Sequence, residues 1–466
     1  MSQRPPVISQ GNYRLRVLVV FALMLGLLAI VGFAQSWSLA LTILNLCIIS
    51  AVMALGVNIQ WGYAGLFNVG IMGFAALGGL AVLLIAMPPV KDAWAAGGIR
   101  VIFALIAFAI TIALALNVHK HLKGKRFQRL SLAAVLIIGI VISRFILDPG
   151  VSAIEAVNPA STGYLGGLGL PVVLAWLVGG AFAAGVAWLI GKVALGLRAD
   201  YLAIATLGIS EIIVAFLRNE DWLTRGVKNV TGLPRPVPYE LELQQTPWFI
   251  ELVEKWNAST LTLLGEAERV AALKALLIEG SSIFVKLSYA CLFLVVLLII
   301  YQLAELALNS PWGRMVRAIR DNEVAADAMG KDVTGRHLQI FILGSAVVGI
   351  AGAMLVTLDG QFTPGSYNPL RYTFLIWVMV IVGGSGNNLG AIIGGFLVWF
   401  IWVEAEPIGF WLINSLTSGM GEDSGLRKHL LDSAQYMRVI IMGSVLLLVM
   451  RFSPWGILPE QTKQFK

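Results

Sequence analysis

Long apolar blocks, separated by short polar segments, repeat along the whole chain. The blocks that are each long enough to form a membrane-spanning helix are residues 17–34, 39–59, 65–87, 99–118, 130–147, 170–190, 201–217, 283–304, 338–358, 372–384, 388–403 and 436–451. A helix needs about 20 apolar residues to cross the ~30 Å hydrocarbon core of a bilayer. The pattern therefore predicts an all-α integral membrane protein, polytopic, with about 10–12 transmembrane segments.

The composition supports this class of protein. Hydrophobic residues make up 58% of the 466 residues and charged residues 13%, whereas a soluble domain carries about 25% charged residues. The net charge of +7 does not indicate nucleic acid, because excess Lys and Arg in a membrane protein usually hold loops in the cytoplasm. Membrane lipid is the partner that we expect. No cofactor or metal is expected, since His119, His121, His337 and His429 lack the spacing of metal ligands.

Basic residues are distributed unevenly between the two ends of the predicted helices. If the chain begins in the cytoplasm and every block crosses, the Lys and Arg clusters within 4–16, 120–129, 314–336 and 451–466 all fall on the cytoplasmic side. The short loops of the other side hold few basic residues: Lys91, Arg371, Arg427 and Lys428. Because short basic loops stay inside, we expect an N-in, C-in chain. Residues 372–384 and 388–403 form either one long kinked helix or two segments that meet at the glycines of 383–386, and this topology requires two segments.

These predictions divide the chain into a cytoplasmic N-terminal tail (1–16), a first part of a transmembrane core (17–217), an extracytoplasmic loop (218–282), a transmembrane helix (283–308), a cytoplasmic loop (309–337), a second part of the core (338–452) and a cytoplasmic C-terminal tail (453–466). Within 218–282, residues 248–256 and 261–280 have the pattern of amphipathic helices. This long loop either receives a partner or is a tolerated insertion. Glycines within 62–79 and 390–395 predict close contacts between helices.

The polar segment 309–336 carries the clearest local signals for helix ends. Ser310 is a typical N-cap, and Pro311 suits the first helical position. Asp321 and Asn322 can cap a second helix over 323–329, which Gly330 would terminate. The segment therefore predicts two short amphipathic helices that project from the membrane. An ordinary solvated loop is the alternative interpretation.

Five ordered motifs resemble one transporter family. They are NIQWGYAGLFNVG at 58–70, YLAIATLGISEII at 201–213, GRMVRAIRDNEVAADAMG at 313–330, IVGGSGNNLGAIIGG at 381–395 and FSPWGIL at 452–458. Together they resemble the branched-chain amino acid permeases of ABC importers, of the LivM type. The chain departs from the family at 224–226, where Thr-Arg-Gly replaces Thr-Gly-Gly, and in an enlarged 218–282 loop.

The resemblance implies partners and a role for the 309–337 loop. The implied partners are two ABC ATPase subunits, a sister permease subunit that makes a heterodimer, and a periplasmic or extracellular solute-binding protein, all at a bacterial plasma (inner) membrane. The loop would be the coupling element that docks on an ATPase, through Arg314, Arg317, Arg320, Glu323, Ala325, Ala326 and Gly330. The chain has no GxxxxGK[ST] phosphate loop, so we expect it not to be an enzyme and ATP hydrolysis to occur on the separate subunits.

Polar residues inside apolar blocks are costly and are therefore candidates for function. The candidates for a translocation pathway are Asn45, Asn58, Tyr63, Asn68 and Glu211. Glu211 is alternatively a structural carboxylate with a basic or amide partner. The function that the sequence favours is import of branched-chain or other hydrophobic amino acids. The alternatives are a permease for urea or short amides and an ion-coupled secondary transporter, which only Glu211 supports.

Overall fold

The computed structural model describes residues 10–122, 127–420 and 424–460. The predicted terminal tails therefore lie partly outside the described residues. Lys123, Lys125 and Arg126 also lie outside them. The main helices are α1 (Gln10–Ala34), α2 (Trp37–Val57), α3 (Ile71–Ala86), α5 (Ile99–His121), α6 (Gln128–Val157), α7 (Val172–Ala194), α8 (Ala199–Asn219), α13 (Glu266–Asn309), α16 (Val333–Asp359), α17 (Pro369–Gly383), α18 (Asn388–Leu416) and α20 (Met437–Phe452).

Shorter elements connect these helices. They are η1 (Asn58–Gly62), α4 (Lys91–Ala93), η2 (Trp94–Gly98), α9 (Asp221–Thr224), η3 (Gly226–Lys228), β1 (Val230–Thr231), α10 (Glu240–Gln245), α11 (Pro247–Trp256), α12 (Ala258–Leu261), α14 (Pro311–Asp321), α15 (Glu323–Ala328), β2 (Gln361–Phe362), η4 (Pro364–Ser366), α19 (Gly425–Asp432) and η5 (Ser433–Tyr436). The two strands pair antiparallel, with Val230 opposite Phe362. Among the described residues, 10 helices are long and apolar enough to cross a membrane, and Ile71–Ala86 and Tyr372–Gly383 are shorter apolar helices. The predicted all-α polytopic membrane class is confirmed.

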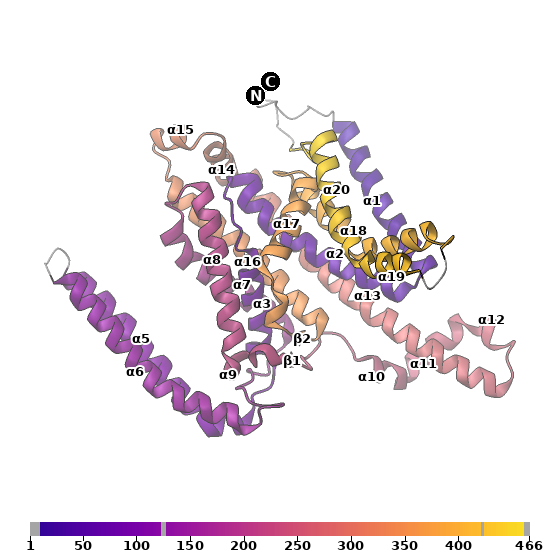
Figure 1. The fold of residues 1–466 in the computed structure, drawn as a ribbon, viewed down its shortest axis with the longest axis horizontal. Helices are drawn as coiled ribbons and strands as arrows, with labels where there is room; N and C mark the ends of the chain where they lie inside the picture. Colours follow the sequence, from indigo (N-terminus) through magenta and orange to yellow (C-terminus); the bar gives the residue numbers. More distant parts are fainter. Residues whose placement is uncertain (1–9, 123–126, 421–423, 461–466) are drawn as a thin grey trace.

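The described chain begins and ends at the same end of the helical bundle. That end also carries α14 and α15, whereas α9, the β1–β2 pair and α10–α12 lie at the opposite end (Figure 1). The expected separation of 372–384 and 388–403 is present, because α17 stops at Gly383 and α18 starts at Asn388. Gly384 and Gly386 in this break have φ angles of 117° and 78°, which glycine adopts without a Cβ penalty.

The centre of the bundle is built from α2, α3, α7, α16, α17 and α18. In Trp37–Gly62, 78% of an apolar stretch of 18 residues is buried, whereas in Gln128–Val157 only 6% of such a stretch is buried. Small residues allow α3, α7 and α16 to approach closely. A Cβ at Gly78 would overlap the Gly349 carbonyl oxygen, and one at Gly352 would overlap that of Ala75. The expected close contacts at glycine are therefore present at Gly78.

Helix α13 corrects the predicted boundary between residues 282 and 283. The amphipathic segment 261–280 and the span 283–304 were expected as separate helices, but Glu266–Asn309 is one helix of 44 residues. It contains no proline and only one glycine, Gly280, so nothing interrupts its hydrogen bonding. At ~1.5 Å per residue it is roughly twice the ~30 Å hydrocarbon thickness. The predicted helix 248–256 is present as α11, which packs on α13 through Phe249 and Phe284.

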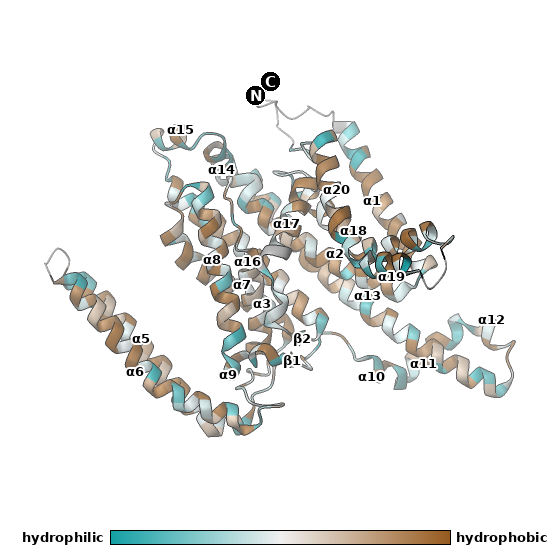
Figure 2. Cartoon of the chain, in the orientation of Figure 1, coloured by the Kyte–Doolittle hydropathy of each residue, from teal (hydrophilic) through white to brown (hydrophobic). Residues whose placement is uncertain are grey.

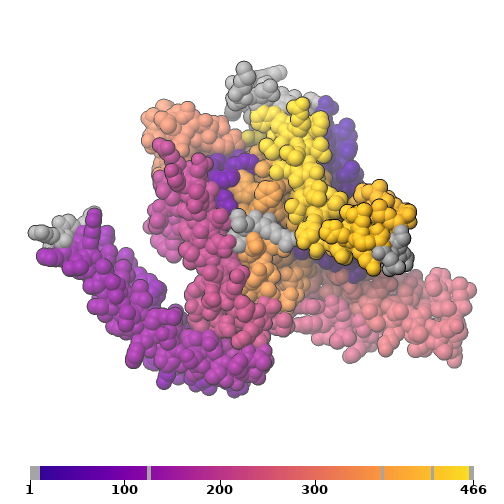
Figure 3. All heavy atoms as spheres, in the orientation of Figure 1, coloured from indigo at the N-terminus to yellow at the C-terminus, as the bar shows by residue number. Residues whose placement is uncertain are grey.

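Helices α5 and α6 form a hairpin that extends away from the bundle (Figures 1 and 3). They pack mainly against each other, and most of their apolar side chains are exposed. Hydrophobic residues cover the hairpin along its length, with polar residues concentrated toward its ends (Figure 2). A surface of this kind suits the hydrocarbon of a bilayer.

Candidate functional site

Two short helices form a knob at the end of the bundle that also carries both termini. We call residues 310–332, with α14 and α15, the two-helix knob (Figure 1). Ser310 caps α14 by accepting a hydrogen bond from the Gly313 amide, and Asn322 caps α15 through the Ala325 amide at 3.0 Å. Gly330 follows α15 with a φ of 73°. The predicted two-helix structure and its caps are confirmed, within one residue at the end of α15.

The knob shares a small apolar core with the first residue of α16. Ile319, Ala326 and Val333 are buried together, with Met315 against them. Ala326 is 9% exposed and also lines the groove between the two helices. Exposed residues of the knob include Val324, Ala325 and Met329, together with Glu323 and Gly330. A groove between the two helices is lined by Met315, Ala325 and Met329.

The three arginines of α14 have different surroundings, although the sequence placed them on one face. Arg314 is exposed. Arg317 donates a hydrogen bond to the Leu308 carbonyl oxygen at 2.6 Å. Arg320 donates to the Gly62 carbonyl oxygen and forms ion pairs with Glu460 at 3.0 Å and Asp321 at 3.2 Å. Arg317 and Arg320 thus anchor the knob on the transmembrane bundle.

Electrostatics keep the Arg320 side chain charged. Burial alone would lower the pKa of the guanidinium, but the carboxylates of Glu460 and Asp321 raise this pKa above its usual value. The cation consequently joins three separate segments: α14, the end of η1 and the C-terminal residues after α20.

A chain of amide side chains links η1 to the break between α17 and α18. The Asn58 amide donates to the Asn388 side-chain oxygen at 3.1 Å, and the Asn58 oxygen accepts from the Gly386 amide at 2.9 Å. Asn388 in turn donates to Glu305 of α13 at 2.9 Å. These bonds satisfy backbone and side-chain groups where two helices are interrupted, as unwound backbone at membrane depth requires.

A second amide cluster holds the segment between η1 and α3. Asn68 donates to the Gln60 side-chain oxygen at 2.9 Å and accepts from the Gly70 amide at 2.9 Å. Gln60 donates to the Phe341 carbonyl oxygen and to Ser345. In this conformation the side chains of Asn58 and Asn68 each donate one of these hydrogen bonds and accept another.

The remaining predicted pathway residues lie apart from these clusters. Tyr63 is buried directly after η1. Asn45 donates to the Lys286 carbonyl oxygen at 2.9 Å, and its own side-chain oxygen is buried without a hydrogen-bond partner. Glu211 is exposed on α8, outside the buried stripe that includes Ser210 and Val214. No ion pair or hydrogen bond of its side chain occurs among the described residues.

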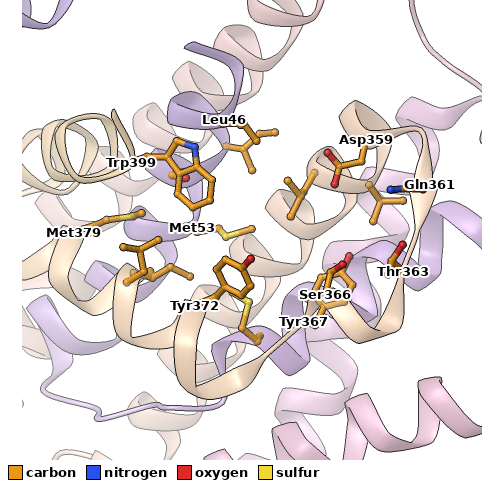
Figure 4. A pocket seen from close by; sticks show the side chains of 17 residues that line it. Leu46, Met53, Asp359, Gln361, Thr363, Ser366, Tyr367, Tyr372, Met379 and Trp399 are labelled. Atoms are coloured by element: carbon orange, nitrogen blue, oxygen red, sulfur yellow. The ribbon is translucent and has the colours of Figure 1, made fainter. Parts of the chain in front are cut away.

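A cavity of about 250 Å³ lies between α2, α3, α16, α17 and α18. One side is mainly apolar and includes Met53, Met379 and Trp399, whereas the other carries Asp359, Gln361, Thr363, Ser366 and Tyr367 (Figure 4). The polar side is supplied by the end of α16 and by the β2–η4 segment that follows it. Figure 4 shows the two sets of side chains on opposite sides of the space, with Tyr372 between them.

No cluster of three or more His, Cys, Asp or Glu side chains suited to a metal ion occurs among the residues that the structure describes.

Comparison with protein families gives one match over most of the chain. The family described as branched-chain amino acid transport system / permease component matches residues 39–450. The chain belongs to this permease family. Together with the ten apolar helices among the described residues, membership makes the permease a multi-pass protein of the bacterial inner membrane.

Curated relatives carry related names. The permease is 26% identical to the high-affinity branched-chain amino acid transport system permease protein LivM of Escherichia coli over 68% of this chain and 64% of the relative. It thus spans slightly less than two thirds of that relative. It is 25% identical to a probable LivM permease of Methanocaldococcus jannaschii over 37% of this chain and 47% of the relative. The fructose import permease protein FrcC of Rhizobium meliloti is 27% identical over 30% of this chain and 37% of the relative. No solved structure matches the chain.

Sequence reasoning missed several residues of these sites. Glu305 and Asn388 are polar residues in or next to apolar blocks, and the same cost argument that selected Asn58 would have selected them. The binding of Arg320 to Gly62 had no sequence signal, because the two residues are 258 positions apart. The polar side of the cavity belongs to residues that were assigned to a short loop between two spans.

Proposed function

We propose that this permease is one membrane subunit of an ABC importer for branched-chain or other hydrophobic amino acids. The observation that carries the proposal is the two-helix knob. It packs a small core against the start of α16, presents Val324, Ala325 and Met329 to solvent, and is anchored in the bundle through Arg320. An element that is folded, anchored and has exposed apolar residues at its tip suits docking into the cleft of a soluble subunit. Names of the relatives support the substrate class.

The proposed assembly contains two ABC ATPase subunits, a sister permease subunit and a solute-binding protein. The knob end would face the cytoplasm and the ATPases, which agrees with the N-in, C-in topology and with the basic residues of 314–336. The opposite end, with α10–α12, would face the binding protein. The proposed 218–282 loop then includes the first turns of α13, which begins at Glu266.

The five candidate pathway residues enter the proposal with different roles. Asn58, Tyr63 and Asn68 lie where η1 and the segment after it would have to move for a path to open. Asn45 has an unpaired buried oxygen on the α2–α13 contact. Glu211 would border a path only if the sister permease covers the exposed side of α8. A Glu211→Gln variant that assembles normally but takes up less solute would support that role, and unchanged uptake would remove it.

The decisive experiment uses the exposed residues of the knob. Val324→Glu and Met329→Glu place a carboxylate in a close-packed contact, and an unpaired buried charge costs several kcal/mol, which is a loss of at least a hundredfold in affinity. We expect the ATPase subunits no longer to co-purify with these variants and ATP-driven L-leucine uptake into vesicles to fall to background. Leu263→Glu, an equally exposed change at the opposite end, is the matched control and should behave as wild type.

Other results would favour other functions. Wild-type co-purification and uptake in both knob variants would remove the knob as the coupling element. Uptake that persists without ATP and follows a Na⁺ or H⁺ gradient would indicate a secondary transporter. Uptake of urea, acetamide or fructose, with none of L-leucine, L-isoleucine or L-valine, would support an ABC importer with a different substrate from the proposed one.

A further inference from the structure

The cavity between α2, α3, α16, α17 and α18 contains buried polar groups that have no partner. Tyr367 is 4% exposed, and its hydroxyl makes no hydrogen bond within the described residues. The Thr363 hydroxyl and the Trp399 indole N–H are likewise buried and unpaired. Buried donors in native proteins are nearly always satisfied by protein, water or ligand. Three unpaired groups around one cavity therefore indicate that a polar molecule completes them.

The division of the cavity into two sides defines the shape of that molecule. Asp359 lies at the exposed end of α16, and no cation of the described residues pairs with it. It offers a negative charge to a ligand at the mouth. Tyr367 and Thr363 offer hydroxyl donors nearby, and α17 begins two residues after Tyr367. The start of a helix inside a membrane protein is electropositive and suits an anionic group of a substrate.

The opposite side of the cavity is mainly apolar. Met53 and Met379 lie there (Figure 4), and Leu375 also lines the cavity; methionine adapts to irregular aliphatic shapes. Filling this side with an aliphatic group removes apolar surface from water. A sugar carries hydroxyl groups around its whole ring, so those that face Met53 and Met379 would be left without hydrogen bonds, which is unfavourable.

We propose that this cavity is a solute-binding site of the permease itself, for a small zwitterion with an aliphatic side chain. The ammonium group lies at Asp359, the carboxylate at Thr363, Tyr367 and the first turn of α17, and the side chain against Met53 and Leu375. This inference rests on the proposed function and adds to it a site and an orientation within this subunit.

The test compares uptake kinetics in vesicles that contain the complete importer and its binding protein. Asp359→Asn should raise KM for L-leucine about tenfold or more, which corresponds to the loss of one charge-assisted contact. Met53→Phe narrows the apolar side, so it should reduce kcat/KM for L-leucine about tenfold relative to L-alanine, as one or two methylene groups do in an apolar pocket. Met53→Ala widens the apolar side, so it should raise kcat/KM for L-leucine relative to L-alanine.

Matched variants outside the cavity serve as controls. Asp92→Asn changes another exposed carboxylate, and Met450→Phe changes an exposed methionine of α20. Both should keep wild-type kinetics. Assembly of every variant is measured by co-purification of the ATPase subunits, and a variant that fails to assemble is replaced by Tyr367→Phe, which removes one hydroxyl and should raise KM for L-leucine.

The outcomes separate this site from the proposed function. If the wild type takes up L-leucine and the Asp359 and Met53 variants match it in KM and in the leucine-to-alanine ratio, the cavity is not a solute site. An equal loss for both amino acids in Met53→Phe would assign the residue a structural role and would also overturn the inference. If the wild type takes up no amino acid, the proposed substrate class itself is wrong.

Discussion

Removing the Arg320 side chain should disconnect the two-helix knob from the transmembrane bundle. Its guanidinium binds the Gly62 carbonyl oxygen and pairs with Glu460 at 3.0 Å, and the two side chains are only 22% and 17% exposed. Arg320→Ala leaves the Glu460 carboxylate and the Gly62 carbonyl without their donor. Breaking a fully buried pair from one side costs about 3–5 kcal/mol. Because both side chains retain some exposure, we expect about 2–3 kcal/mol here.

A double-mutant cycle measures this interaction. Arg320→Ala, Glu460→Ala and the double variant are compared by unfolding in mixed micelles, and we expect a coupling energy of about 1–2 kcal/mol. The matched control is the Arg144–Asp148 pair of α6, whose N–O distance is 3.3 Å but whose side chains are 59% and 58% exposed. An exposed pair of this kind contributes about 0.5 kcal/mol. A coupling energy for Arg320 and Glu460 no larger than that of the control pair would refute the reasoning.

The same variants have a functional readout. If the knob passes movement to the bundle through Arg320, an importer that carries Arg320→Ala should still hydrolyse ATP. It should hydrolyse more ATP than the wild type for each solute molecule taken up. Arg320→Lys keeps the charge but loses the planar guanidinium that binds Gly62 and Glu460 together. Its ratio of ATP hydrolysed to solute taken up should therefore lie between the ratios of the wild type and Arg320→Ala. A wild-type ratio of ATP hydrolysed to solute taken up in Arg320→Ala would show that the knob acts through other contacts.

Three further predictions concern packing, the amide chain and topology. Gly78→Leu should prevent assembly, measured by size-exclusion chromatography, because a side chain there overlaps the backbone of α16; Gly26→Leu, with open space around it, should assemble normally. Asn58→Ala orphans two hydrogen-bonding groups and should lower stability by about 2–4 kcal/mol in the same unfolding assay. An impermeant thiol reagent added outside should label a cysteine at Trp256 and not one at Val324, and the reverse pattern would contradict the N-in, C-in topology.

Local signals in the sequence were sufficient for much of the fold. The caps at Ser310 and Asn322 and the stop at Gly330 each depend on a few adjacent residues, so the two-helix knob could be predicted. The break between α17 and α18 was predicted for the same reason, since glycines at 383–386 tolerate the required backbone angles. The continuous helix α13 was missed because a change from amphipathic to fully apolar pattern was taken as a boundary, although no residue there ends a helix.

Contacts between distant segments could not be predicted from one sequence. The packing of Ala326 against Ile319 and Val333 could not be predicted, because Val333 belongs to the next long helix, α16. Arg320 looked like one of three surface charges, yet its partners are 258 and 140 residues away. The cavity is assembled from five helices, and its polar side comes from a segment whose only sequence feature was its position between two spans.

Helix α17 gives the knob and the cavity a common structural element. Its last residues are held by the C-terminal segment, because the Ile457 and Leu458 amides donate to the Val382 and Gly383 carbonyl oxygens at 2.9 Å. That segment continues to Glu460, the partner of Arg320. Further along the same helix, Leu375 and Met379 form part of the cavity wall. A helix of 15 residues moves largely as a rigid unit, so a displacement of the knob that pulls on Glu460 acts on the cavity wall without unfolding any segment between them. Two sites that are far apart in the sequence are therefore connected by one short helix, which lines the cavity through Leu375 and Met379 and is bound at its end by the segment that carries Glu460.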